Sequence, residues 1–342
     1  MLGMTAPSTA AAVRAGISGF SGHPFMVDAA GNRMTVALAP YLSIDLTGAE
    51  RLAEIAGPAA VEAVYALASA PGDKSAVPVF VGLPLARPGL AHNLEPVSER
   101  VRAEISASGL RVGTVALNQS GHAAGAMAVQ AAWRSIQSGA TEFALAGGVE
   151  SYMDPETLEW LEANDQLHSA GTENNPYGFI PGEAGAFVLL ASAAAAQRYG
   201  LLAPLELPAV TTTRETKLIK TDAVCVGEGL TALFRSLSAG LSPGAQVDDL
   251  YCDMNGEPYR ADEFGFATVR AGGLFKDPSE FTAPADCWGD VGATSGPLFL
   301  ILAEAAVRKG YALGPLAAVI TSSESGERSG FIARVRTTGG RR

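Results

Sequence analysis

One histidine lies where side chains often do chemistry, at the junction of a strand-like run and a helix-like run. The segment 117–126, LNQSGHAAGA, ends an apolar stretch, turns, and opens an Ala/Gly-rich stretch at His122. An imidazole there could act as a general acid or base, bind a ligand or only fill space. Ser120 could be a nucleophile with His122 as its base, but residues two apart rarely aim at each other on a turn. We therefore interpret Ser120 as the N-cap of the helix.

The remaining histidines and the cysteines lie outside this segment. Three histidines occupy polar or loop-like contexts and are expected at the surface: His23, His92 and His168. Three cysteines are widely spaced, with no CxxC pair and no Cys/His metal spacing: Cys225, Cys252 and Cys287. Such thiols are typical of a reduced, cytoplasmic protein, and we expect that compartment here.

Composition narrows the class of protein. Of the 342 residues, 48% are hydrophobic and 17% charged, a balance typical of a packed globular chain rather than a disordered one. The net charge is −11 and no basic cluster occurs, so nucleic acid is not an expected partner. No apolar run reaches the ~18 residues of a membrane span, and the N-terminus lacks a charged region followed by an apolar core. We expect no membrane association and no processing.

Strand-like and helix-like patterns alternate along the chain. Runs rich in β-branched residues predict strands over 77–83, 112–117, 143–149, 205–210, 248–254, 316–323 and 330–335. Helical patterns cover 98–109, 122–139, 227–240, 260–272 and 293–310. Residues 178–192 are expected to form two strands around a glycine-rich bend, followed by a helix to Gly200. This order predicts mostly parallel sheets covered by helices on both faces.

The chain is expected to divide near residues 200–204 into two similar halves, 1–202 and 203–342. Each half places a short polar turn between a strand and an Ala/Gly-rich helix, LNQSGH in the first and PADCWGDVGATSG in the second. Ligands in such sheets bind beyond the carboxyl ends of the strands, so a shared pocket is expected at these turns.

Residues 112–200 resemble the β-ketoacyl synthase branch of the thiolase superfamily, the condensing enzymes of fatty-acid and polyketide assembly. The resemblance rests on IQSGATEFALAGGVESYMDPETLEWL (136–161) and GFIPGEAGAFVLLASAAAAQRYG (178–200). It implies an α/β thiolase-like fold, with two similar halves that form a five-layered αβαβα core of mixed, mostly parallel sheets. It also implies acyltransferase ancestry, no cofactor, and a dimer joined through edge strands near Ala146-Gly147-Gly148.

The same resemblance locates an altered site. The family's nucleophilic cysteine lies about 21–25 residues before the AGG turn, and counting back without a gap places it at His122. The two family histidines correspond to Asp253 in DMNGEP and Asp290 in CWGDVGATSG. The family's lysine corresponds to Ala285, and its aromatic gate to residues 324–327. The resemblance therefore implies that Cys-His-His has become His-Asp-Asp, with no nucleophile for the usual thioester.

Three interpretations of this trio remain open. A carboxylate can orient an imidazole and raise its pKa, so His122, Asp253 and Asp290 could transfer protons or activate water. One imidazole and two carboxylates could instead hold Mn, Fe or Zn, although no HxH or HxxE spacing supports a metal. In the third interpretation, His122 fills a retired pocket and the aspartates neutralise it.

Three further residues are candidates for substrate binding. Asn255 could hydrogen-bond a substrate carbonyl or close a turn. Ser120 lies beside the predicted site, and Glu183 in GEAGA is expected to support the pocket floor, in a role that is more structural than catalytic.

Two classes of function follow from the resemblance. The first is an enzyme that acts on thioesters of acyl carrier protein or coenzyme A by acid/base chemistry rather than by standard condensation. The second is a non-catalytic subunit similar to the chain-length subunits that pair with active ketosynthases. The chain could therefore form a homodimer or a heterodimer with a ketosynthase.

Overall fold

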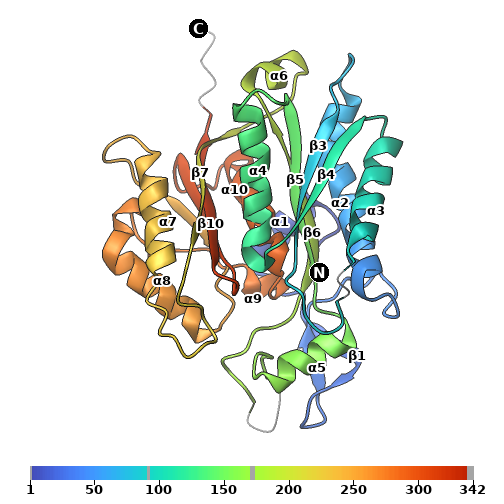
Figure 1. The fold of residues 1–342 in the computed structure, drawn as a ribbon, viewed down its shortest axis with the longest axis vertical. Coiled ribbons are helices and arrows are strands. Elements are labelled where there is room, and N and C mark those ends of the chain that lie inside the picture. The colour runs from blue at the N-terminus through green and yellow to red at the C-terminus, as the bar shows by residue number, and fades with distance from the viewer. Residues whose placement is uncertain (1, 91–92, 170–173, 337–342) are drawn as a thin grey trace.

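Two four-stranded sheets and their helices form five layers in a computed structural model that describes residues 2–90, 93–169 and 174–336 (Figure 1). Helices α2 (Gly48–Ser69) and α3 (Glu95–Ala107) cover the outer face of the first sheet. Helices α4 (Ala124–Gln137) and α10 (Ser295–Lys309) lie between the two sheets. Helices α7 (Glu228–Ala239) and α8 (Pro258–Ala271) lie outside the second sheet. This is the five-layered α/β fold expected from the sequence.

The first sheet has the order β4-β3-β5-β6. Its strands are β3 (Val77–Leu83), β4 (Val112–Gln119), β5 (Phe143–Ser151) and β6 (Glu183–Ala191). β3, β4 and β5 are parallel, whereas β6 runs antiparallel to β5. Every residue of β5 is buried, because helices cover both faces of the sheet and strands flank β5 on both sides.

The second sheet has the order β7-β10-β9-β8. Its strands are β7 (Leu205–Arg214), β8 (Asp249–Cys252), β9 (Leu316–Ser322) and β10 (Glu327–Val335). β8 and β9 are parallel, and β10 is antiparallel to both β9 and β7. The first sheet takes its strands from before Gly200 and the second from after it; the assignment of 1–202 and 203–342 as separate domains stays a prediction.

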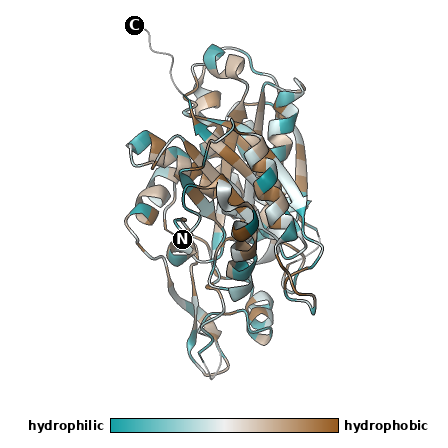
Figure 2. Cartoon of the chain, turned by 90° about the vertical axis from the view of Figure 1, so that its left-hand side faces the viewer, coloured by the Kyte–Doolittle hydropathy of each residue, from teal (hydrophilic) through white to brown (hydrophobic). Residues whose placement is uncertain are grey.

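The remaining elements are short or lie at the periphery. They are α1 (Ala6–Arg14), β1 (Ser21–Val27), β2 (Arg33–Val36), α5 (Pro155–Ala163), α6 (Ala193–Arg198) and α9 (Ala285–Trp288). Three single turns of 3₁₀ helix lie at Gly121–Ala123, Gly272–Leu274 and Gly292–Thr294. Figure 2 shows the apolar residues gathered along the sheets and the helices between them.

Two expectations from the sequence are wrong. Residues 178–192 form one strand, β6, because residues 178–181 make only isolated bridges, such as Pro181 to Asp290, rather than a ladder. The AGG segment lies in β5, which is flanked by β3 and β6, so it cannot be the edge at which two subunits join. The edges of the first sheet are β4 and β6.

Helix α2 is long and apolar enough, by length and composition alone, to cross a membrane. In this fold it packs against α3, β5 and β6, and its buried residues include Leu52, Ile55, Val64 and Leu67. These contacts are those of a core helix.

Candidate functional site: a buried histidine–aspartate cluster

Two similar turns face each other at the centre of the molecule. β4 leads into the 3₁₀ turn Gly121–Ala123 and then α4, while α9 leads through Asp290 into the 3₁₀ turn Gly292–Thr294 and then α10. Gly121 and Gly292 have positive φ values of 62° and 41°, which favour glycine at both positions. Both turns lie at the starts of helices, where the sequence predicted a shared site.

Small residues let the two helix starts approach closely. A Cβ atom added to Gly125 of α4 would lie 2.4 Å from the carbonyl oxygen of Ala293, and one added to Gly148 of β5 would lie 2.1 Å from the same oxygen. A Cβ on Gly296 of α10 would lie 2.7 Å from the backbone nitrogen of Ala126. This close packing of backbones brings His122 to Asp290.

His122 and Asp290 form a buried pair. The Nε2 atom of His122 lies 2.9 and 2.8 Å from the two carboxylate oxygens of Asp290, and the residues are 7% and 4% exposed. The Asp290 carboxylate also accepts hydrogen bonds from Asn255 Nδ2 at 2.6 Å, the backbone N–H of Gly292 at 2.8 Å and the hydroxyl of Tyr152 at 3.3 Å. Donors on four residues therefore surround this carboxylate.

The electrostatics of the pair favour its charged form. Burial alone would lower the pKa of His122, but the negative charge of Asp290 and its hydrogen bond raise the pKa above the ordinary value. Burial opposes ionisation of Asp290, yet the contacts with His122, together with Arg260 and Asn255, hold the pKa of that carboxyl well below its usual range. These contacts favour an imidazolium–carboxylate pair in a buried site.

Asp253 lies in the neighbouring loop but pairs with a different residue. Its Oδ2 atom lies 3.1 Å from an Nη of Arg260 and accepts the backbone N–H of Ser322 at 2.7 Å. The same Arg260 nitrogen donates to the carbonyl oxygen of Ser322 at 3.0 Å. The charge of Asp253 is the smallest of the contributions that raise the pKa of His122. The structure thus brings together His122, Asp290 and Asn255, and Asp253 anchors Arg260.

Asn255 links the pair to a second charged group. Its Nδ2 donates to Asp290 and, at 2.9 Å, to Glu257, which also accepts the hydroxyl of Tyr259 at 2.6 Å. Lys220 lies 3.0 Å from the other oxygen of Glu257. Burial opposes the ionisation of Glu257, but the positive charges of Arg260 and Lys220 lower its pKa below the ordinary value.

Sequence reasoning missed three residues on the other side of the pair. Arg87 lies 2.7 Å from Glu150 and 4.2 Å above the ring of Tyr152, whose hydroxyl reaches Asp290. Glu150 also accepts the backbone N–H of Ala293 at 3.3 Å. Glu150, near the end of the apolar strand FALAGGVES, is the one member of this group that the sequence could have indicated. A carboxylate buried in such a strand needs a partner of opposite charge or hydrogen-bond donors.

The space beside the pair is small. The cavity lined by Asp253, Asn255 and Asp290 measures about 10 Å³, which is room for about one water molecule. A groove of about 1530 Å³ lies elsewhere, and none of His122, Asp253 and Asp290 lines it. Of these two spaces, the one that borders Asp290 is too small for an acyl chain.

Comparison with known proteins identifies proteins that share this fold. Residues 103–196 match the model of the β-ketoacyl synthase N-terminal domain. A structure of a type II PKS acyl-carrier protein in complex with its ketosynthase bound to the hexaketide has a TM-score of 0.77 and 16% identity, covering 98% of this chain and 96% of that chain. Residues 103–196 therefore match a ketosynthase domain, and the whole chain has the fold of the ketosynthase structures. The ishigamide ketosynthase/chain length factor aligns with a TM-score of 0.76 and 17% identity, covering 98% of this chain and 96% of the other.

A longer protein has the same fold. The ketosynthase from module 6 of the bacillaene synthase of Bacillus subtilis 168 aligns with a TM-score of 0.72 and 12% identity, covering 97% of this chain and 70% of its own. A comparison with curated proteins found no match. The segment 103–196 of this ketosynthase-like chain contains no cysteine, and the interpretation of His122 as the substitute for a nucleophile stays a prediction.

Ser120 and Glu183 lie outside the charged pair of this ketosynthase-like chain. Ser120 occupies the expected N-cap position of the 3₁₀ turn, but its hydroxyl donates to Asn118 Oδ1 at 2.8 Å and makes no capping hydrogen bond. Both oxygens of Glu183 bind Arg51, at 2.6 and 2.8 Å, and one accepts the hydroxyl of Ser151. The Glu183 carboxylate is buried and forms an ion pair with Arg51. These contacts do not support the predicted role of Glu183 in substrate binding.

One expected surface histidine of the ketosynthase-like chain is buried. His23 is 2% exposed, and its Nδ1 accepts the backbone N–H of Met26 at 2.9 Å. Burial, with the nearby charge of Arg51, lowers its pKa. His168 is half-buried, and His92 lies outside the described residues.

The cysteines do not supply an alternative nucleophile. All three are free thiols, and burial raises the pKa of each one, that of Cys252 to about 12. A thiolate is the reactive form, so these thiols are protonated near neutral pH. Cys252 and Cys287 are buried, and Cys225 is half-buried.

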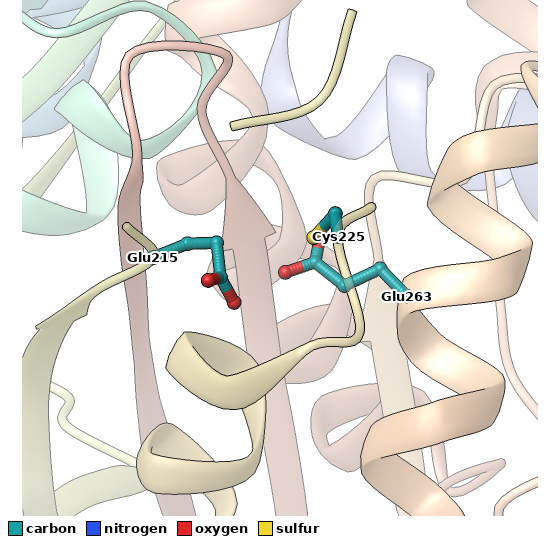
Figure 3. Close-up of side chains that lie close together, drawn as sticks. All are labelled: Glu215, Cys225 and Glu263. Carbon is teal, nitrogen blue, oxygen red and sulfur yellow. The ribbon is translucent and has the colours of Figure 1, made fainter. Parts of the chain in front are cut away.

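Figure 3 shows Glu215, Cys225 and Glu263 with their side chains facing one another. Their potential ligand atoms lie within 4.8 Å of each other, and in the described part of the chain this is the one such group. Arg328 lies 2.7 Å from Glu263 and already supplies the positive charge. Glu215 accepts the backbone N–H of Gly229 at 2.8 Å. We therefore interpret the group as a structural ion pair rather than a metal site.

Proposed function

We propose that this chain is a non-catalytic ketosynthase-like subunit, of the chain-length-factor kind, that pairs with an active ketosynthase in cytoplasmic fatty-acid or polyketide assembly. The carrying observation is the closed site: the imidazole of His122 is held by Asp290, and the adjacent cavity has room for about one water molecule. An acid/base group must reach its substrate to act. An imidazole enclosed in this way stabilises the turn instead.

Two similar structures support the choice of partner. One is a ketosynthase/chain length factor, and the other is an acyl-carrier protein in complex with its ketosynthase. We therefore propose a ketosynthase and an acyl carrier protein as partners, with the carrier's acyl chain held by the active subunit. A homodimer is the alternative assembly.

The surface proposed for subunit pairing is the edge strand β4. It is the outer strand of the first sheet, and Val112, Val115 and Leu117 are only half-buried. An edge strand offers unpaired backbone N–H and C=O groups to a second sheet. A ketosynthase joined here would approach the turn that carries His122.

The decisive experiment uses intact-protein mass spectrometry. The chain is incubated with malonyl and acyl thioesters of coenzyme A and of a carrier protein, alone and after co-purification with a ketosynthase. We expect no acyl adduct and no turnover from this chain alone. His122→Cys, with His122→Ser as its matched control, places a thiol at the turn and should also remain unacylated. Acylation of the unmodified chain, or of the cysteine variant, would refute a closed, non-catalytic site.

A second function rests on the raised pKa of His122. An imidazolium beside Asp290 is suited to proton transfer, so an enzyme that decarboxylates malonyl thioesters without covalent capture is the competing proposal. That enzyme would release carbon dioxide with a pH-dependent rate, and His122→Ala would abolish the release without unfolding the protein. The non-catalytic proposal expects no release from either form.

A further inference from the structure

Helix α8 exposes a strip of residues on the side that faces away from the core. Its inner side is buried, and the residues buried there include Phe264 and Ala267. Five exposed residues lie at helical spacing on the other side: Asp262, Gly265, Phe266, Val269 and Arg270. Residues three or four positions apart share one face of a helix. These five residues therefore form one continuous surface, which we call the α8 strip.

The centre of the α8 strip is apolar. Val269 is 89% exposed, the highest value among the large apolar side chains of the described residues, and Phe266 is 43% exposed. A Cβ atom added to Gly265 would meet no atom within 4 Å, so the surface beside these side chains is open. Single apolar side chains are common at protein surfaces, but two on one helix face beside an open glycine form a surface that another helix can cover.

The two ends of the α8 strip carry opposite charges. In the described part of the chain, the ion pairs of α8 are formed by Arg260 and Glu263, which are buried. Asp262 and Arg270 form no ion pair there. Arg270 donates a hydrogen bond to a backbone carbonyl, and its guanidinium lies 5.9 Å from the centre of the Phe266 ring. Each of the two charged residues lies four positions, about 6 Å, from Phe266, in opposite directions along the helix.

This pattern is complementary to itself when it is rotated by half a turn. In an antiparallel pair of α8 helices with a two-fold axis at Phe266, Asp262 of each copy lies level with Arg270 of the other. Val269 then lies level with the space between Asp262 and Gly265 of the other copy, where the glycine leaves room for it. The two Phe266 rings meet at the axis. A parallel pair in the same register would instead place like charges together, which is unfavourable.

We propose that the α8 strip binds the α8 strip of a second copy of this chain, with the two helices antiparallel about a two-fold axis at Phe266. The charges set the direction of the helices, whereas the apolar residues supply most of the association energy, because exposed ion pairs contribute little. Helix α8 lies in the outer layer on one side of the molecule, and β4 belongs to the sheet on the other side (Figure 1). The contact is therefore separate from the surface proposed for a ketosynthase and does not depend on the role of His122.

Analytical ultracentrifugation of the isolated chain, over a range of concentrations, tests the contact by exchange of charge. Asp262→Arg sets two positive charges against each other at both ends of the helix pair, and Arg270→Asp sets two negative charges there. Each variant alone should therefore associate about tenfold more weakly. An equimolar mixture of the two variants restores opposite charges at both ends and should associate as tightly as the unaltered chain. Glu159→Arg reverses an exposed charge on α5 and, as the matched control, should have no effect.

Gly265→Leu tests the apolar part of the contact. The added side chain extends into open space in the single chain, so the variant should fold, as circular dichroism would check. It occupies the place of Val269 of the second copy and should weaken association about tenfold.

The outcomes separate this contact from pairing through β4. If β4 also joined two copies, the unaltered chain would form tetramers, and both charge reversals should return it to dimers. Four results would overturn the proposal: a chain that stays monomeric at its highest soluble concentration, association that neither charge reversal weakens, a mixture that associates no more tightly than the single variants, or loss of ketosynthase binding in Asp262→Arg. The last result would assign the α8 strip to the ketosynthase.

Discussion

Replacing Asp290 by asparagine removes the charge at the centre of the buried cluster. The carboxylate accepts hydrogen bonds from His122 at 2.8 Å, Asn255 at 2.6 Å, the Gly292 backbone at 2.8 Å and Tyr152 at 3.3 Å. In asparagine one carboxylate oxygen becomes an NH2 group, which cannot accept hydrogen bonds from these donors. At least two charge-assisted hydrogen bonds are therefore lost, at about 1.5–3 kcal/mol each. We therefore expect the free energy of unfolding to fall by about 3–5 kcal/mol near pH 6, as for other broken buried pairs.

The pH dependence has a definite sign. Because the folded-state pKa of His122 is raised, its contribution is complete below the ordinary value of about 6.5 and is lost as pH rises through the folded pKa. The folded-state pKa of Asp290 is lowered, so its contribution is present above about 3.9 and is lost as pH falls towards the folded pKa. The cost of Asp290→Asn should therefore be largest between about pH 4 and 6.5 and smaller at pH 9.

Urea unfolding followed by circular dichroism at pH 6 and pH 9 measures this cost. His122→Gln and the double variant complete a double-mutant cycle, and we expect the double variant to cost clearly less than the sum of the single variants. A cost below about 1 kcal/mol at pH 6, unchanged at pH 9, would mean that the pair is solvated like a surface salt bridge. The closed site would then be refuted.

Three other perturbations test the packing around the site. Glu183→Gln strands the buried guanidinium of Arg51 and should lower the free energy of unfolding by about 3–5 kcal/mol in the same urea assay, and replacing both residues by methionine should cost less. Gly125→Ala drives a Cβ to 2.4 Å from the Ala293 carbonyl and should lower the melting temperature by several degrees, measured by calorimetry. Cys252, whose pKa burial raises to about 12, should resist iodoacetamide at pH 8 until urea unfolds the protein, as mass spectrometry would detect.

Much of the fold could be predicted because its strands carry strong local patterns. The expected strand 77–83 coincides with β3, and the expected strand 143–149 lies within β5. Helix α2 was missed because Gly57 and Pro58 interrupt its helical pattern. In the structure Gly57 packs closely on Arg100 of α3, so tertiary contact overrides the local preference.

Part of the site could be predicted, for a different reason. The spacing to the AGG turn located His122, the turn CWGDVGATSG located Asp290, and the structure places the two residues in contact. The partners of Asp253 and Tyr152 could not be predicted, because Arg260 and Arg87 reach them through the folded chain and leave no periodic signal in the sequence. Burial of His23 was missed for the same reason.

The feature that joins the two halves also closes the site. Gly125 and Gly148 allow the backbone carbonyl of Ala293 to approach so closely that a Cβ at either position would clash with it. That approach carries Asp290 onto His122 and leaves about 10 Å³ beside the pair. An enzyme needs the same imidazole to face its substrate, so a tighter junction would lower activity while it strengthens the buried pair. The proposed non-catalytic role rests on this close packing.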